Sequence, residues 1–281
     1  MGTSSIYGGP SNSNPKDNPL LPKDFDLGEK EKPENNNSKE DDILKADENT
    51  NKISNKDLDP KKEVSWKDAK SYMSKYASGK YKSSRRAISN QIKAYGGSRA
   101  AAKTARAGIS TVISLGKFTN TISSSGFKSA LEEYKIDFEN QSPREVLNHL
   151  TNILAPIPIT KDDAVARKAL IVTLEYVYEL FEEESIDYDL LDENSFNLMV
   201  PKFIENYIYE RIINDLGSRI ESNSDTSQEA VNIEMELKEY INAKVEIAFK
   251  GMNFSQINFN EPKINNKVES LINQCYTLIE E

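Results

Sequence analysis

The stretch TKDDAVARKALIVTLEYVYELF, residues 160–181, decides which fold the chain can adopt. Its apolar residues recur every three or four positions, which is the period of one face of an α-helix. That face and the positions beside it comprise Val165, Ala169, Leu170, Val172, Leu174, Tyr176, Val177, Leu180 and Phe181. So wide an apolar face predicts a central helix that its neighbours mostly bury.

Helical signals also flank this stretch on both sides. Ser142-Pro143-Arg144-Glu145 places a serine cap, a first-turn proline and a glutamate where a helix begins. Ser65 and Asp68 form a similar start, and we expect one helix over 99–115 that Gly116 ends. No strand alternation and no fixed repeat is found. We therefore expect an all-α domain of about seven to nine helices.

A long disordered N-terminal tail is expected before this domain. Residues 1–62 contain 6 of the 11 prolines, and their apolar residues have no period. Such a segment cannot bury enough apolar surface to offset its ordering entropy. Residues 1–22 carry few charges and several apolar residues, so they are either a recognition peptide or a frayed end. Residues 23–62 have the composition of a charged linker.

Charge divides the rest of the chain in two. The net charge of −9 conceals a segment, residues 61–130, with 15 Lys and Arg against 2 Asp and Glu. Residues 131–281 hold 13 basic and 30 acidic residues. We therefore divide the helical part into a basic subdomain, 63–130, and an acidic domain, 131–281. Such asymmetry is typical of an interaction surface.

The basic segment suggests two kinds of partner. Lysines and arginines interleaved with aromatic residues can bind phosphate backbones and stack on bases, so residues 66–106 could form a nucleic-acid interface. The same cations could instead dock on the acidic domain or on a partner protein, and the charge run leaves both open. The residues that we assign to a basic interaction surface are Lys82, Arg85, Arg86, Lys93, Arg99, Lys103 and Arg106.

Catalytic chemistry has few candidate residues in this sequence. One cysteine, Cys275, excludes an internal disulfide and fits a reducing cytoplasm, and one histidine, His149, cannot complete a structural zinc site with it. Neither a phosphate-binding GxxxxGK[ST] loop nor a GxGxxG motif is present. We expect no enzyme, no metal and no cofactor of its own, although a hydrolase that uses His149 with carboxylates remains an alternative.

The sequence also predicts where the protein works. No apolar run approaches the roughly 18 residues of a membrane span, and the N-terminus has no secretory pattern. Met1-Gly2 is followed by Ile6 where myristoylation requires Ser or Thr. We expect a soluble cytoplasmic protein without a membrane partner.

Three parts of the sequence resemble one known family. The opening Met1-Gly2-Thr3-Ser4-Ser5-Ile6-Tyr7-Gly8-Gly9-Pro10, with Pro19-Leu20-Leu21-Pro22 after it, is similar to the N-terminus of the QatB family of the bacterial Qat anti-phage defence system. Tyr95-Gly96-Gly97-Ser98-Arg99-Ala100-Ala101 resembles the region after its variable linker. Ile213-Asn214-Asp215-Leu216-Gly217-Ser218-Arg219 resembles a later block.

The resemblance implies a function for the N-terminus. Qat systems also contain an ATPase, a QueC-like protein named QatC and a TatD-like nuclease. The resemblance implies that QatC, with ATP and a 7-deazaguanine precursor, joins the nucleobase to the N-terminal glycine, here Gly2 after removal of Met1. The residues implied for recognition by this enzyme are Thr3, Ser4, Ser5, Ile6, Tyr7, Gly8, Gly9 and Pro10.

The chemistry of these residues agrees with that role. An α-amine has a pKa of about 7.7–8.0, so part of it is neutral and nucleophilic at neutral pH. Glycine has no Cβ and fits a narrow active site. A flexible linker of about 50 residues would reach on the order of 40 Å. The resemblance therefore predicts a modified, non-enzymatic defence component whose helical body docks other Qat proteins.

Overall fold

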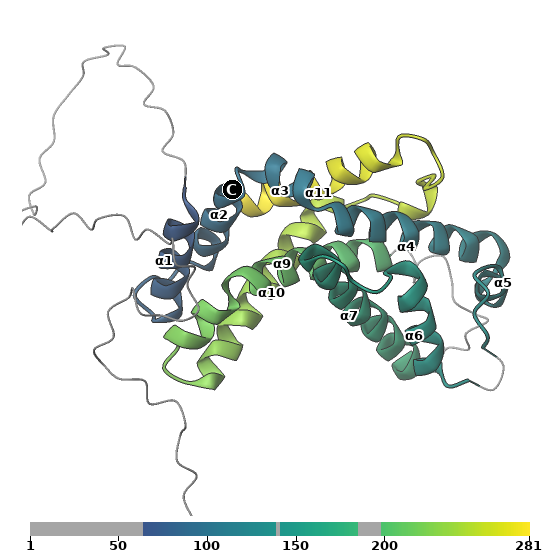
Figure 1. Ribbon diagram of the computed structural model, residues 1–281, viewed down its shortest axis with the longest axis horizontal. Helices are drawn as coiled ribbons and strands as arrows, with labels where there is room; N and C mark the ends of the chain where they lie inside the picture. The colour runs from purple at the N-terminus through teal and green to yellow at the C-terminus, as the bar shows by residue number, and fades with distance from the viewer. Residues whose placement is uncertain (1–63, 139–140, 185–197) are drawn as a thin grey trace, which may run out of the picture. The chain divides into compact units, whose positions relative to one another are not determined.

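The computed structural model describes residues 64–138, 141–184 and 198–281, all within one compact unit. Ten α-helices and one 3₁₀ helix lie in these ranges and no strand does, which confirms the all-α prediction (Figure 1). The elements are α1 Trp66–Ala77, α2 Ser84–Ala94, α3 Ser98–Thr104, α4 Arg106–Ser125, α5 Phe127–Glu133, α6 Pro143–Leu154, α7 Lys161–Glu184, α9 Met199–Asn223, α10 Ser227–Phe249, η3 Phe254–Gln256 and α11 Ile264–Glu280. The tail predicted over 1–62 lies outside the described residues.

Local capping signals start three of the helices where the sequence predicts them. At α6 the backbone N–H of Ser142 donates to Glu145 at 2.8 Å, and the N–H of Glu145 donates back to the Ser142 hydroxyl. Ser65 and Asp68 form the same reciprocal box before α1. At α7 the N–H of Thr160 donates to Asp163 at 2.8 Å. Such boxes satisfy N–H groups that have no partner inside the helix.

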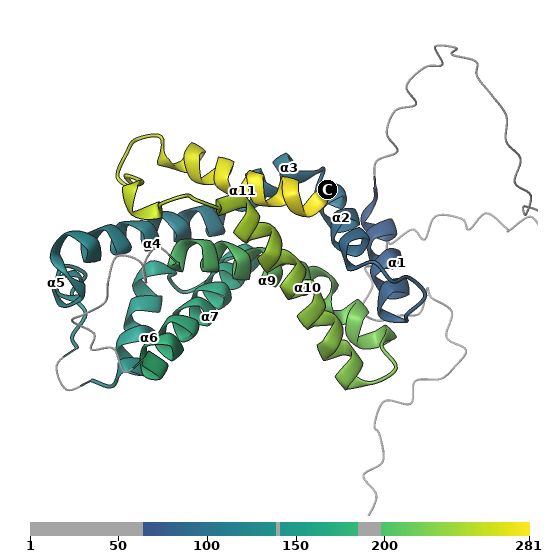
Figure 2. The same cartoon turned by 180° about the vertical axis from the view of Figure 1, so that it is seen from behind.

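The most central helix is α9 rather than α7. In both views α9 lies between α7 and α10, and it also packs against α1 and α4 (Figure 2). Phe203, Tyr207 and Leu216 of α9 are fully buried. By contrast, α7 exposes Ile171 and charged residues on its outer face. Residues 160–181 were expected to form a central helix that is mostly buried. One face of α7 is buried as expected, and the opposite face is exposed.

Two helices occupy the region where we expected one helix that ends at Gly116. Ala105 separates α3 from α4, and α4 continues through Gly116 to Ser125. A Cβ on Gly116 would lie 2.4 Å from the ring of Phe259. Glycine at this position therefore allows close packing inside a helix, and it does not end the helix. Gly108, also in α4, packs in the same way: a Cβ there would lie 2.3 Å from the ring of Tyr207.

One hydrophobic core joins the basic and acidic segments. Buried side chains on both sides of residue 130 belong to the same cluster, and α11 packs against α2, α3 and α4. The C-terminal end of α11 lies beside α2 and α3 (Figure 1). The boundary at residue 130 thus marks a change of charge, and as a domain boundary it stays a prediction.

The packing at Gly116 gives a stability test. Alanine favours helix by about 1 kcal/mol over glycine, so Gly116→Ala should stabilise α4 if nothing blocks the new methyl group. We expect instead a net loss of about 1–3 kcal/mol in the free energy of unfolding, because the ring of Phe259 must move. Urea unfolding followed by circular dichroism measures it. Ser123→Ala, at an exposed position of α4, should change stability by less than about 0.5 kcal/mol. Equal stabilities of the two variants would contradict the close packing.

Candidate interaction site

A buried arginine joins several helices at the middle of α9. The side chain of Arg211 is only 10% exposed. Its guanidinium donates hydrogen bonds to the carbonyl oxygen of Ala101 at 2.9 Å, to the Tyr276 hydroxyl at 3.0 Å and to Thr104 Oγ1 at 3.1 Å. The planar fork of arginine suits such simultaneous donation, which a lysine cannot reproduce. Arg211 therefore fastens α3 and α11 to α9.

Aromatic rings surround the same cation. The guanidinium carbon of Arg211 lies 4.8 Å from the ring centre of Tyr95, 5.7 Å from that of Tyr207 and 6.0 Å from that of Tyr276. Ring faces carry partial negative charge and attract a desolvated cation. The three tyrosines therefore replace part of the water that Arg211 loses on burial.

Asp162 supplies the negative charge beside Arg211. Its Oδ1 accepts a hydrogen bond from the Tyr207 hydroxyl at 2.6 Å and lies 3.8 Å from Arg211 Nε. Its Oδ2 accepts from the backbone N–H of Ala107 at 2.9 Å. Ala107 lies in the first turn of α4, where N–H groups lack intrahelical partners and the preceding Ala105 offers no side-chain cap. Asp162 of α7 thus caps a different helix, α4.

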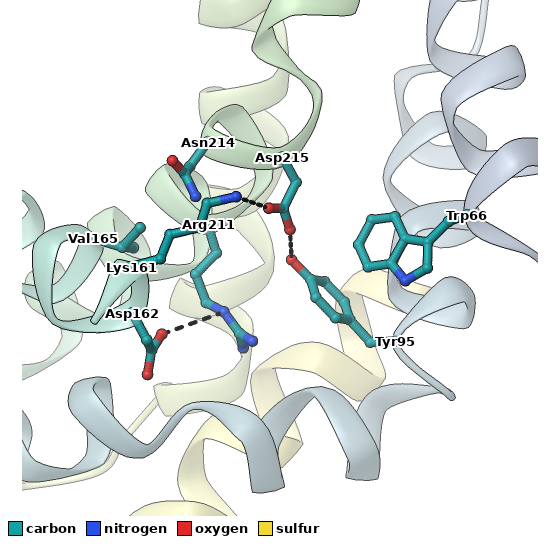
Figure 3. Close-up of a pocket in the computed structure, with 8 residues that line it drawn as sticks. All are labelled: Trp66, Tyr95, Lys161, Asp162, Val165, Arg211, Asn214 and Asp215. Atoms are coloured by element: carbon teal, nitrogen blue, oxygen red, sulfur yellow. Dashed lines mark hydrogen bonds and ion pairs between the residues drawn. The ribbon is translucent and has the colours of Figure 1, made fainter. Parts of the chain in front are cut away.

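A surface pocket of about 310 Å³ opens beside this network (Figure 3). Asp215 of α9 accepts hydrogen bonds there from the Tyr95 hydroxyl and, at 2.9 Å, from Lys161 Nζ. The Trp66 ring packs edge-on against Tyr95 at 5.0 Å between centres. The lining residues are Trp66, Tyr95, Lys161, Asp162, Val165, Arg211, Asn214 and Asp215. Two cations and two carboxylates line this pocket, so its formal charge is balanced.

Burial keeps the phenols of this site protonated. Desolvation raises the pKa of Tyr95, Tyr207 and Tyr276 above the ordinary value of a tyrosine. For Arg211 burial alone would lower the pKa, but the neighbouring tyrosines and Asp162 raise it. At neutral pH the tyrosines are therefore neutral hydrogen-bond donors and Arg211 is a cation. This arrangement can hold helices in place and present polar groups to a ligand.

The candidate catalytic residues lie elsewhere and apart. Cys275 is fully buried, and burial raises the pKa of its thiol, which agrees with its prediction as a small buried hydrophobe. His149 is exposed on α6. Within the described residues no group of three His, Cys, Asp or Glu side chains could hold a metal ion. No helix in the same residues is long and apolar enough to cross a membrane.

Comparison with known proteins identifies the family. A family model described as Qat anti-phage system associated protein QatB matches residues 96–279, about two thirds of the chain. The chain belongs to the QatB family. No curated protein and no solved structure matches the sequence. Membership of this family makes the chain a component of Qat anti-phage defence. It implies that the chain's partners are other Qat proteins.

The two internal blocks that resemble QatB meet at the pocket. Tyr95 begins the first block, Asp215 lies in the second, and the two side chains are hydrogen-bonded to each other. Sequence reasoning did not single out Arg211, Asp162 or Trp66 as parts of one site. The second block begins two residues after Arg211, and this proximity was the one sequence signal that pointed toward the site. It did not indicate that a buried cation lies there.

Gly2 and the recognition residues Thr3–Pro10 lie outside the described residues. The basic surface predicted from the sequence lies within them. All seven cations assigned to the basic surface are exposed, and none forms an ion pair within the described part of this QatB chain. The basic segment therefore docks on the acidic one without using these cations.

The start of α3 is occupied by a carboxylate of the protein itself. Gly97 precedes α3, and the N–H groups at a helix start attract anions. In the structure the N–H of Ser98 donates to the Glu280 carboxylate at 2.8 Å. The Ser89 hydroxyl donates to the Glu280 carbonyl oxygen at 2.7 Å. A residue of the acidic segment thus binds the helix start that could otherwise hold a phosphate.

The buried arginine gives a second stability test. Arg211→Lys keeps the charge but loses the fork that reaches Ala101, Thr104 and Tyr276. We expect a loss of about 2–4 kcal/mol in the free energy of unfolding, because buried oxygens lose charged donors. Chemical unfolding measures it, and Arg219→Lys, at an exposed position two turns later on α9, should stay within about 0.5 kcal/mol of the natural chain. A loss no larger than that of the control would contradict the role of Arg211.

Proposed function

We propose that this QatB-family chain is a non-enzymatic protein substrate within the Qat anti-phage system. Its N-terminal glycine, Gly2 after removal of Met1, is conjugated to a 7-deazaguanine-type nucleobase by the QueC-like partner QatC. ATP and a 7-deazaguanine precursor are used by QatC, and the chain needs no cofactor. The observation that carries the proposal is the family match, together with the N-terminal decapeptide that resembles the QatB N-terminus.

The proposed conjugation is a condensation. ATP adenylates a carboxyl group of the precursor and pyrophosphate is released. The neutral Gly2 amine attacks the acyl carbon, the amide bond forms as the C–O bond to AMP breaks, AMP leaves, and the amine loses a proton. The amine suits this step because its pKa of about 7.7–8.0 leaves a neutral fraction at neutral pH, unlike lysine near 10.4. The chain therefore gains the mass of the precursor less one water.

The helical body has the complementary role of docking other Qat proteins, which include the ATPase and the TatD-like nuclease. Two observations support this role. The polar groups at the Arg211 pocket are hydrogen-bonded to one another, which favours a fixed surface. The basic face also remains unpaired within the described residues.

Intact-protein mass spectrometry after co-expression with QatC tests the conjugation. We expect the added mass on the natural chain and at least tenfold less of it on Gly2→Ala, which keeps the α-amine but adds a Cβ. Gly28→Ala, the same change made in the linker 23–62, is the matched control and should retain the adduct. Phage should plate poorly on cells whose chain carries the adduct, and plating efficiency should rise where the adduct is lost. An unmodified Gly2 in cells that contain ATP and the precursor would contradict the proposal.

Nucleic-acid binding through residues 66–106 is the second candidate function, and it is favoured by the seven exposed cations of the basic interaction surface, which form no ion pair among the described residues. It predicts binding to duplex DNA or RNA that weakens steeply between two salt concentrations, because counterions are released from the phosphates. The paired change Lys93→Glu and Arg99→Glu should then weaken binding and flatten the salt dependence. Binding isotherms at micromolar protein measure this. No salt-dependent binding at those concentrations would exclude the candidate.

A further inference from the structure

The loop between α6 and α7 exposes large apolar side chains. Ile157 is 83% exposed and Ile159 is 95% exposed, whereas Ile247, the next most exposed large apolar residue of the described chain, is 59% exposed. Ile153, at the end of α6, is 41% exposed. We call Ile153, Ile157 and Ile159 with the intervening loop the isoleucine loop. Single exposed apolar residues are common, whereas large contiguous apolar patches mark interaction sites.

The isoleucine loop is fixed at both ends. Arg167 of α7 donates hydrogen bonds to the carbonyl oxygen of Ala155 and, at 2.6 Å, to Asn152 Oδ1. The Asp163 carboxylate accepts from the N–H of Ile159 at 3.2 Å. Between these ends Pro156 and Pro158 restrict their own φ angles and the conformations of the residues before them. The isoleucines are therefore held in the exposed position, and a partner that covers them has little loop entropy to overcome.

A hollow lies against the same loop. Its volume is about 190 Å³, and Ile157, Ile159 and Pro156 form one side of it. Ala107, Ser110 and Thr111 of α4 contribute another side. An apolar cavity of about 150 Å³ is large enough to hold benzene. The hollow can therefore accept one apolar side chain of a partner while the isoleucines pack against the partner's surface.

The charges beside the hollow indicate the chemistry of the partner. Arg106 is exposed directly before Ala107 and four residues before Ser110, on the same side of α4. Arg167 directly follows the lining residue Ala166 and donates to the neutral oxygens of Ala155 and Asn152, and neither arginine forms an ion pair within the described residues. Asp163, the carboxylate that lines the hollow, already accepts the N–H groups of Ile159 and Thr160. Two cations are thus left for carboxylates from outside.

We propose that the isoleucine loop and its hollow are the docking site for a segment of another Qat protein that carries an apolar anchor and adjacent carboxylates. The anchor fills the hollow, and the carboxylates pair with Arg106 and Arg167. This inference rests on the proposed function, in which the helical body docks other Qat proteins. A second copy of the chain fits less well, because a two-fold interface would place these arginines near their own copies.

Affinity measurements with the full-length chain test the proposal. The QueC-like protein, the ATPase and the nuclease are purified and titrated one at a time. Replacing both Ile157 and Ile159 by serine should weaken binding to one of them at least tenfold, because two apolar side chains lose their burial. Ile247→Ser, on α10, is the matched control and should stay within twofold. Thermal unfolding should be unchanged for both, since these side chains are exposed.

A charge change tests the carboxylates of the partner. Arg106→Glu should weaken the same interaction at least threefold and reduce its salt dependence, whereas Arg219→Glu, at an exposed position of α9 outside the basic interaction surface, should not. The docking site is overturned if none of the three proteins binds, if the serine variant binds as the natural chain does, or if Ile247→Ser weakens binding equally. It is also overturned if sedimentation shows that the loop instead holds two copies of this chain together.

The same preparations separate this inference from the conjugation. Intact mass reports the Gly2 adduct, and affinity reports docking. An adduct without loop-dependent binding would overturn the docking site alone. Loop-dependent binding without an adduct would support the docking site and contradict the conjugation.

Discussion

The folded part of the chain depends on the burial of one cation. Removing an arginine from water costs several kcal/mol unless hydrogen bonds and nearby negative charge compensate for the loss. Arg211 obtains these from the Ala101 carbonyl, from Tyr276 and from Asp162, which belong to α3, α11 and α7. Each of these segments must be in place for the compensation to be complete. The requirement therefore fixes how segments more than 100 residues apart meet at α9.

The seven cations of the basic interaction surface form no ion pair with the acidic segment in the part of the chain that the structure describes. Contacts between the two segments include apolar side chains in a common core and single hydrogen bonds such as Ser98 N–H to Glu280. Carboxylates of the acidic segment serve the basic one as helix caps, as Asp162 does for α4. Cations such as Arg86, Lys93 and Arg106 consequently remain at the surface. The charge asymmetry is thus available for other molecules.

The sequence predicts those features that neighbouring residues determine. The starts of α1, α6 and α7 follow from caps three residues apart, and the exposure of the basic residues follows from their charge. The role of Gly116 could not be predicted, because glycine often ends helices and Phe259, which explains it, is 143 positions away. Arg211 was missed for the same reason, since an arginine in a helix is usually exposed. The two blocks around Tyr95 and Asp215 resembled a family, but only the fold brings them into contact.

The carboxylates and phenols of the pocket are hydrogen-bonded to groups within the protein. Arginine, tyrosine and carboxylate together can move protons when one of them is directed at a substrate. Here the Asp162 oxygens accept from Tyr207 and Ala107, and those of Asp215 accept from Tyr95 and Lys161. Burial raises the pKa of the phenols, so the tyrosines hold their protons at neutral pH. A network with its donors and acceptors directed at one another is suited to rigidity, and a rigid body supports the proposal that this chain is acted upon and docked by its partners.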